Sequence, residues 1–461
     1  MHVDKMSSSE WRAITSISSI MSLRMIGLFF VLPLFTLYAS QLPGATPTLI
    51  GLAMGIYGLA QAIFQIPFGV LSDHFGRKPL ILTGLLIFII GSLVAGKAHS
   101  ITFMIIGRAL QGTGAIGSTL LALMADLVRE EQRTKAMAIS GISIGFSFSI
   151  AMFIGPILSK WFPINDLFFI AAVLGWLAII LLCVWVPKPI VTRWHSDTEP
   201  ELKSFFKLLL SPELAKLNSG IFILHAVFTA SFIVIPINLY HLAGLITSRQ
   251  WLIYLPTLLV AFIICLFCIG VAEKKQQLKL FFLGGILTLG LAEFFLWQMP
   301  SNLFLTAISL SLFFSGFSLL EAFLPSLITR TAPASRKGSA LGLYSCSQFL
   351  GIFVGGALGG ILYGKYHFAG VYLFCIILLC FWFTLAFFMQ APRYLMTRFI
   401  RLPLSKQNQW DSFATQLRLI PGMVEVTFIA EEGIAYLKME KGTVKNPDFI
   451  RLKEQLQSDS I

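Results

Sequence analysis

Long apolar runs separated by short polar segments repeat along most of this sequence. A membrane-spanning helix needs roughly 20 predominantly apolar residues, and twelve runs approach or exceed that length. They are expected at residues 13–38, 48–71, 79–96, 101–123, 136–160, 166–187, 215–240, 250–271, 278–298, 301–327, 338–363 and 368–390. The pattern predicts an all-α membrane protein with twelve transmembrane helices.

The longest polar segment between these runs, residues 188–214, divides the spans into two groups of six. Its stretch 201–210 is amphipathic and is expected to lie along the membrane surface. We therefore expect an N-terminal six-helix bundle at 1–187, an interdomain linker at 188–214 and a C-terminal six-helix bundle at 215–390.

Similar short sequences in the two halves indicate an internal duplication. Residues 133–138 open the fifth span much as residues 336–340 open the eleventh. Both spans finish with glycines suited to close helix packing, at Gly155 in one and at 355–360 in the other. These similarities indicate that the two halves are repeats of one another.

The tail at 391–461 differs in kind, because its charge density rises and the long apolar runs end. Its pattern predicts a strand, a helix, two strands joined by a turn at 431–433, and a last helix capped by Asn446. These elements are expected at 399–404, 410–419, 423–429, 434–440 and 446–457. The order β-α-β-β-α predicts a small α+β, ferredoxin-like cytoplasmic domain.

Composition and loop charge set the environment. The chain is 56% hydrophobic and only 12% charged, whereas soluble domains carry about 25% charged residues. About eighteen Lys and Arg residues fall on the loops that share a side with the N-terminus, against four on the other side, at Lys97, Lys160, Arg249 and Lys365. This bias predicts a multi-pass membrane protein with both termini cytoplasmic, and the family resemblance given below implies the bacterial inner membrane. It also explains the net charge of +12 without nucleic-acid binding.

Several classes of chemistry have no support in the sequence. The six cysteines all lie in apolar runs, and no Cys/His group has metal-ligand spacing. No P-loop and no Gly-x-Ser-x-Gly elbow in a suitable context occurs. The polar N-terminus followed by a long apolar run is not a cleavable signal. We expect no enzyme activity, no metal and no cofactor.

The segment between the second and third spans reads G-V-L-S-D-H-F-G-R-K-P-L at 69–80. Gly76 permits a tight turn, and Asp73 and Arg77 stand one helical turn apart. The spacing of Gly69, Asp73, Gly76, Arg77 and Lys78 resembles the signature of the major facilitator superfamily of transporters.

Further segments follow in the order that the family has them. The fourth span carries R-A-L-Q-G-T-G from Arg108, resembling the family's R-x-x-Q-G motif. The fifth carries Gly141, Gly145, Gly155 and Pro156, resembling a glycine-rich motif of antiporters, although the paired glycines usual after the proline are absent. With the tail domain, the chain resembles the YajR-type subgroup of drug–proton antiporter-like transporters.

The resemblance implies a latch between the halves. Asp73 would face the amino end of the eleventh span, and Arg77 would pair with Asp126 at the end of the fourth. Both contacts would close the cytoplasmic side and favour an outward-open state. The alternative is that these three residues are solvated loop charges.

Ionisable residues within spans are costly and therefore point to function. The spans that line the central cavity in this family carry Arg24, Arg108, His225 and Glu321, one each. Glu321 is the candidate proton carrier and Arg108 a fixed charge that modulates it. Histidine ordinarily titrates near neutral pH, which suits proton transfer, but His225 is equally a neutral histidine of the protein core. For Arg24, the alternative to a role in transport is a structural role.

Two further groups of polar residues remain. Glu293, near the outer end of the ninth span, is expected to snorkel to water. Candidate cavity walls share polar or amphipathic side chains on inner spans, and each is equally a hydrogen-bonding link between helices. They are Tyr57, Gln61, Gln65, Gln111, Asn238, Tyr254, Tyr344 and Gln348.

These features predict a proton-coupled secondary transporter that exports a drug-like or metabolite solute by antiport through alternating access. The expected partners are a small-molecule substrate and the lipid bilayer, with the proton as coupling ion. We expect a monomer whose tail mediates regulation or self-association. The alternatives are a proton-coupled nutrient symporter, or a membrane sensor that acts through the tail.

Overall fold

The computed structural model describes residues 6–187, 208, 211–298, 301–333, 337–390, 395–401, 410–429, 434–440, 443 and 446–457. The predicted amphipathic stretch at 201–210, apart from Leu208, and the turn predicted at 431–433 lie outside the described residues.

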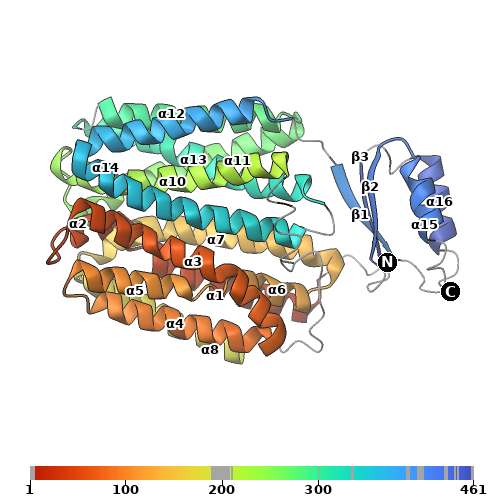
Figure 1. Cartoon of the computed structure of the whole chain (residues 1–461), viewed down its shortest axis with the longest axis horizontal. Helices are drawn as coiled ribbons and strands as arrows, with labels where there is room; N and C mark the ends of the chain where they lie inside the picture. The colour runs from red at the N-terminus through yellow and green to blue at the C-terminus, as the bar shows by residue number, and fades with distance from the viewer. Residues whose placement is uncertain are drawn as a thin grey trace.

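Two helical groups follow one another along the chain and pack side by side (Figure 1). The first contains α1 (Ser8–Phe29), α2 (Leu32–Ala39), α3 (Pro47–Phe75), α4 (Arg77–Gly96), α5 (Ile101–Thr113), α6 (Gly117–Leu127), α7 (Glu130–Leu158) and α8 (Ile164–Val184). The second contains α10 (Pro212–His241), the 3-10 turn η1 (Thr247–Arg249), α11 (Trp251–Lys274), α12 (Leu278–Gln298), α13 (Leu303–Thr331) and α14 (Lys337–Phe387). We call these groups the N-half and the C-half.

Four of the predicted spans differ from single, separate helices. The span predicted at 13–38 is broken between α1 and α2, where Pro33 lacks the N–H that would bond one turn back. The span predicted at 101–123 is broken between α5 and α6 at 114–116. The last two spans form the 51-residue α14, interrupted by the non-helical His367 (φ 53°, ψ −147°).

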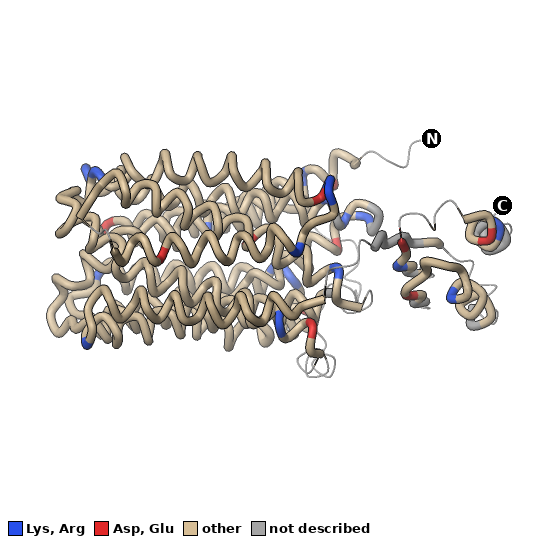
Figure 2. The backbone as a smooth tube through the Cα atoms, turned by 90° about the horizontal axis from the view of Figure 1, so that it is seen from above, with Lys and Arg blue, Asp and Glu red and all other residues tan. Residues whose placement is uncertain are grey.

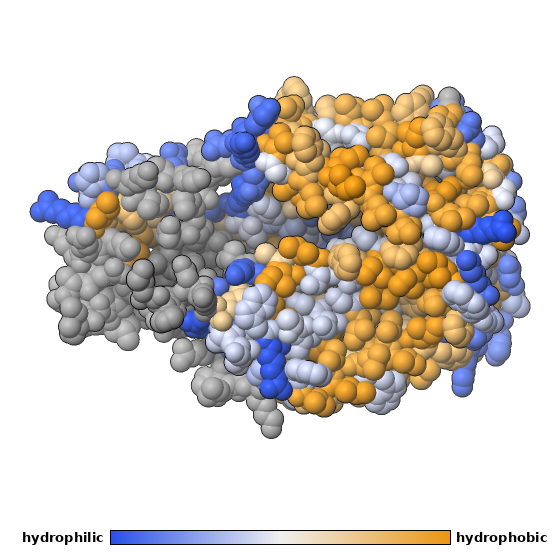
Figure 3. Space-filling view, turned by 180° about the vertical axis from the view of Figure 1, so that it is seen from behind, coloured by the Kyte–Doolittle hydropathy of each residue, from blue (hydrophilic) through white to orange (hydrophobic). Residues whose placement is uncertain are grey.

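Ten helices of the described chain are individually long and apolar enough to cross a membrane. One of these, α14, contains two predicted spans, and α5 with α6 supplies a further crossing. The prediction of an all-α membrane protein with twelve crossings is therefore confirmed. Figure 3 shows the apolar side chains along the flanks of the bundle, and Figure 2 shows the Lys and Arg residues gathered near its ends, most of them toward the tail domain.

The two halves contact each other closely at the end of the bundle away from the tail domain. A Cβ built on Gly356 of α14 would lie 2.7 Å from the Gly51 carbonyl oxygen of α3. The Thr36 hydroxyl of α2 donates to the Phe232 carbonyl of α10 at 3.3 Å. The close-packing role predicted for the glycines at 355–360 is confirmed, because only glycine allows backbones to approach so closely.

Helix α7 is packed at one end and open at the other. A Cβ on Gly155 would lie 1.8 Å from the Phe30 carbonyl oxygen, so α7 touches the α1–α2 break. At Gly141 and Gly145, nearer the tail end, no atom lies within 4 Å of a Cβ position. Pro156 continues within the helix. The Cβ positions of Gly141 and Gly145 therefore face open space, whereas that of Gly155 is packed against the chain.

The tail forms a three-stranded antiparallel sheet with the order β1-β3-β2, from β1 (Leu395–Arg401), β2 (Met423–Ile429) and β3 (Ile434–Glu440). Helices α15 (Trp410–Arg418) and α16 (Pro447–Gln457) cover the face of the sheet away from the bundle (Figure 1). The Asn446 side chain caps α16 by accepting from the Asp448 N–H at 2.9 Å. The strand predicted at 399–404 is displaced, because β1 begins four residues earlier.

The sheet is tied to the bundle by one buried side chain. Lys438 of β3 donates from Nζ to the Ala332 carbonyl, just after the end of α13, at 2.9 Å. The Lys438 side chain is buried although lysine is usually exposed. A cation at the carboxyl end of a helix is favourable because of the helix dipole.

Candidate functional site

The turn between α3 and α4 holds a compact charged cluster. Gly76 has φ +90° and ψ 150°, a conformation that favours glycine, and Arg77 begins α4 directly after it. Arg77 donates to the Ser72 hydroxyl at 2.6 Å, to the Asp73 carboxylate, and from Nε to Asp126 Oδ2 at 3.3 Å. The predicted contact between Arg77 and Asp126 is therefore present.

This cluster connects parts of the N-half. Asp73 pairs with Arg77, its neighbour one turn away, and the residues before 337 that would open the eleventh span lie outside the described chain. Lys78 donates to the Val186 carbonyl at 2.6 Å, beyond the end of α8. The contacts of Arg77 and Lys78 thus join α3, α4, α6 and the end of α8. The latch between the halves remains a prediction.

Ser72 was not among the predicted residues, although it lies inside the quoted motif. It accepts from Arg77 and donates to the Gly69 carbonyl at 2.6 Å, and its side chain is buried. Its position one residue before Asp73 could have indicated this role, since serine hydroxyls often bond to a carbonyl three or four residues back.

Glu321, Gln348 and His225 meet in the C-half, from α13, α14 and α10. The Gln348 amide lies 2.9 Å from His225 Nε2 and 3.3 Å from Glu321 Oε1, and His225 Nε2 lies 3.8 Å from Glu321 Oε2. His225 Nδ1 lies 3.3 Å from the Ile221 carbonyl. Since Nδ1–H donates and Nε2 accepts in this arrangement, it fits a neutral imidazole.

The same helices touch the N-half next to this cluster. Phe317, one turn before Glu321, packs on Phe148 of α7 with ring centroids 5.9 Å apart. Cys346, two residues before Gln348, approaches the Ala62 carbonyl of α3 at 3.7 Å. The Glu321 side chain is 37% exposed despite its place midway along α13. The cluster therefore lies at the interface between the halves.

Arg24 is anchored to the break in the fourth span. Its guanidinium donates to Gln61 Oε1 at 2.8 Å and to the Gly114 carbonyl, just past the end of α5, at 2.7 Å. Gln61 in turn donates to Gln65 at 3.0 Å. A cation at the carboxyl end of a helix compensates the unpaired carbonyls there. The geometry favours the structural alternative for Arg24.

Arg108 lies among neutral groups. It donates to Gln111 Oε1 at 2.9 Å, and its Cζ lies 5.7 Å from the centre of the Phe35 ring and 5.3 Å from that of Tyr57. Gln111 donates to the Ser92 hydroxyl at 2.8 Å. Arg108 is buried, and its Nε has no hydrogen-bond partner.

The remaining predicted wall residues divide into two kinds. Asn238 donates to the Tyr372 hydroxyl at 2.9 Å, which links α10 to α14 within the C-half. Tyr254 and Tyr344 are buried, and their hydroxyls have no hydrogen-bond partner among the described residues. The Asn238 contact fits the helix-linking alternative, and the two tyrosine hydroxyls are enclosed within the C-half.

The expectation that Glu293 snorkels to water is wrong. Its side chain is fully buried, and its carboxyl meets the Ser231 hydroxyl of α10 at 2.5 Å. Ser231 also bonds to the Val227 carbonyl at 2.8 Å. One hydroxyl hydrogen cannot serve both acceptors, so the arrangement fits a protonated Glu293 that donates to Ser231. Sequence spacing gave its depth along α12 but not the direction in which it points.

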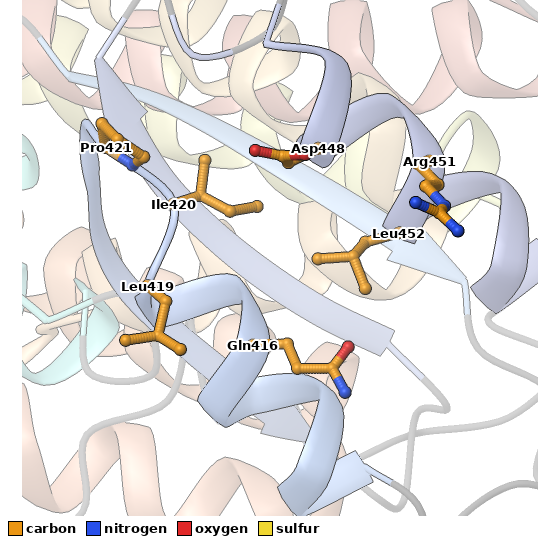
Figure 4. Close-up of a pocket in the computed structure, with 7 residues that line it drawn as sticks. All are labelled: Gln416, Leu419, Ile420, Pro421, Asp448, Arg451 and Leu452. Carbon is orange, nitrogen blue, oxygen red and sulfur yellow. The ribbon is translucent and has the colours of Figure 1, made fainter.

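A separate pocket of about 370 Å³ lies in the tail domain, away from these side chains (Figure 4). Its walls come from α15, the following turn and α16, and include Ile420, Leu452 and the charged residues Asp448 and Arg451. Within the described residues, no group of three His, Cys, Asp or Glu side chains is arranged to hold a metal ion.

Two repeated helical halves, a charged turn after α3 and buried ionisable residues between the halves define a multi-pass membrane transporter. The Major Facilitator Superfamily profile matches residues 17–356 and 250–401, and the chain belongs to this family. Its members carry small-molecule substrates across lipid bilayers and are not enzymes.

One relative matches nearly end to end. The inner membrane transport protein YajR of Escherichia coli (strain K12) is 42% identical over 438 residues, which cover 95% of this chain and 96% of YajR. The resemblance to the YajR type is therefore confirmed. The class B tetracycline resistance protein of Escherichia coli is 31% identical over 32% of this chain and 37% of its own.

Solved structures show the same fold. A bacterial homologue of the human lysosomal transporter Spinster, in an inward-facing and occupied conformation, superimposes with a TM-score of 0.66 at 13% identity. The match covers 83% of this chain and 97% of that one.

Proposed function

We propose that this chain exports a drug-like or metabolite solute in exchange for protons. The observation that carries the proposal is the cluster of Glu321, Gln348 and His225 at the interface between the halves. A carboxyl beside an imidazole in a membrane interior suits reversible proton binding. Protonation of Glu321 removes a charge at the interface and so changes the cost of bringing the halves together.

The direction of transport rests on two further observations. Gly155 and Pro156 stand where the resembling antiporter motif has them, and Gly155 touches the α1–α2 break. A relative over about a third of the chain is a tetracycline resistance protein. Both favour export by antiport over nutrient uptake by symport.

The orientation follows from charge. Most Lys and Arg residues gather toward the end that carries the tail domain (Figure 2), which by the positive-inside rule is cytoplasmic. We place the protein in the bacterial inner membrane as a monomer with both termini inside.

Proton movement in proteoliposomes tests this proposal. Purified protein is reconstituted with an inside-acid gradient, and solutes are added singly while internal pH is recorded. A solute that dissipates the gradient with wild type but not with Glu321→Gln supports antiport through Glu321. Equal responses from wild type and Glu321→Gln show that a residue other than Glu321 carries the proton. Movement of proton and solute in the same direction establishes symport.

The tail supplies the alternative of a sensor, because its sheet contacts the end of α13, the helix of Glu321. Removal of residues 391–461 separates the two functions. A transporter with a regulatory tail keeps part of its flux, whereas a sensor loses its output.

A further inference from the structure

Ionisable side chains within the membrane-spanning part are divided by sign between the halves. The N-half spans contain Arg24 and Arg108, and their acidic residues lie near helix ends, as Asp73 and Asp126 do. The C-half spans contain Glu293 and Glu321. Since a buried charge is costly unless it is paired, each of the two arginines needs a compensating group.

Within the described residues, Arg24 is better compensated than Arg108. Arg24 bonds to the Gly114 carbonyl at 2.7 Å, where the α5 dipole ends, and to Gln61. Arg108 has one hydrogen bond there, to the neutral Gln111, although a guanidinium offers five N–H donors. Arg108 is 6% exposed, and its buried Nε, like that of Arg24, has no partner in the described part of the chain. Among the described residues, Arg108 is therefore a buried cation with neither an anion nor a helix end beside it.

The neighbours of Arg108 place it one side-chain layer from the interface between the halves. Tyr57, which lies against the guanidinium, packs edge-on against Phe349 of α14 with centroids 6.1 Å apart. Phe35, the other ring, precedes Thr36, whose hydroxyl contacts α10. A solute between the halves would therefore meet aromatic faces and a guanidinium together.

We propose that the transported solute is an organic anion whose carboxylate, sulfonate or phosphate group is held by Arg108. The planar fork of arginine matches such groups bidentately. Phe35, Tyr57 and Phe349 receive the apolar or aromatic body of the solute. This inference rests on the proposed function, because it names the substrate class of the same transporter.

Matched naphthalene probes test the anion site on the full-length protein in detergent. The anions are naphthalene-2-carboxylate and naphthalene-2-sulfonate, and the cationic twin is naphthalen-2-ylmethylammonium. Thermal unfolding is followed as each probe is raised to millimolar concentrations. We expect both anions, and not the cation, to raise the unfolding temperature of wild type.

Three variants test whether the stabilisation by the anions depends on Arg108. Arg108→Gln is expected to abolish stabilisation by the anions. Arg108→Lys is expected to need about tenfold more anion for the same rise in unfolding temperature, because lysine lacks the planar fork of arginine. Lys97→Gln, which removes an exposed cation beyond the end of α4, responds as wild type does. The unfolding transition without probe shows whether each variant is folded.

The proposal is overturned if neither anion stabilises wild type, if the cation does so equally, or if Arg108→Gln keeps the anion response. The Glu321→Gln proton assay is read separately. If flux is coupled to protons but the anions do not stabilise the protein through Arg108, the proposed substrate class is rejected and the proposed transport function stands. An anion response without proton movement leaves the site and removes proton coupling.

Discussion

Arg24 Nη2 lies 2.7 Å from the Gly114 carbonyl oxygen, so a guanidinium closes the carboxyl end of α5 inside the membrane-spanning part of the chain. Lipid offers no hydrogen bonds to a broken helix, and every freed carbonyl has to be satisfied by the protein. The Gly114 carbonyl also accepts from the Ile116 N–H at 3.0 Å, and Arg24 adds a charged donor to it, which we expect to stabilise the break between α5 and α6.

Arg24→Gln tests this role. Loss of a charged hydrogen bond to a buried carbonyl is expected to cost ~1.5–3 kcal/mol, and a glutamine is too short to replace the bonds to both Gly114 and Gln61. Thermal unfolding of the purified protein measures the loss, with Lys97→Gln as the control for a removed surface cation. A variant as stable as wild type would show that Gly114 needs no such donor.

Asp73→Asn is expected to reduce transport by about tenfold or more, equivalent to ~1.4 kcal/mol or more, while the protein still inserts and folds. The change removes one of the two carboxylates that hold the buried Arg77 guanidinium. Flux into proteoliposomes and the amount of folded protein are measured together. Transport at the wild-type rate would remove the latch from the mechanism.

Glu293→Gln is expected to change stability by less than ~1 kcal/mol, because a glutamine amide can donate to the Ser231 hydroxyl as the protonated acid does. Glu293→Ala removes the hydrogen bond and leaves a cavity, which is expected to cost ~2–4 kcal/mol. Thermal unfolding distinguishes the two. Equal losses in both variants would indicate that Glu293 is ionised, since glutamine would then fail as a substitute.

Gly356→Leu is expected to abolish transport while the protein still folds. Even its Cβ would lie 2.7 Å from the Gly51 carbonyl oxygen, so the two halves cannot pack together at the end of the bundle away from the tail domain. Labelling of an introduced cysteine near that end is expected to rise. Gly284→Leu is the matched control, because no atom lies within 4 Å of its Cβ position. Unchanged flux in Gly356→Leu would show that this closure is not required.

The sequence predicts those features that depend on local pattern. Apolar runs of sufficient length show where the chain crosses the bilayer, and the spacing of Asp73, Gly76 and Arg77 predicts the turn after α3. The start of β2 at Met423 and the Asn446 cap of α16 follow from equally local rules. In each case the residues that decide the structure lie within a few positions of one another.

Features set by distant partners were not predictable in the same way. The hydropathy pattern does not show that the helix is interrupted at Gly114, because the compensating donor, Arg24, lies in another span. Glu293 was placed at the correct end of its helix but on the wrong face, since Ser231 is 62 positions away. The partner of Asn238 is Tyr372, and nothing near Asn238 in the sequence indicates it.

The Lys438 bond to Ala332 has a mechanical consequence. It fastens the tail sheet to the end of the helix that carries Glu321, so a rocking movement of the C-half swings the tail with it. We therefore expect the orientation of the tail sheet to follow that of α13 whenever the C-half moves relative to the N-half.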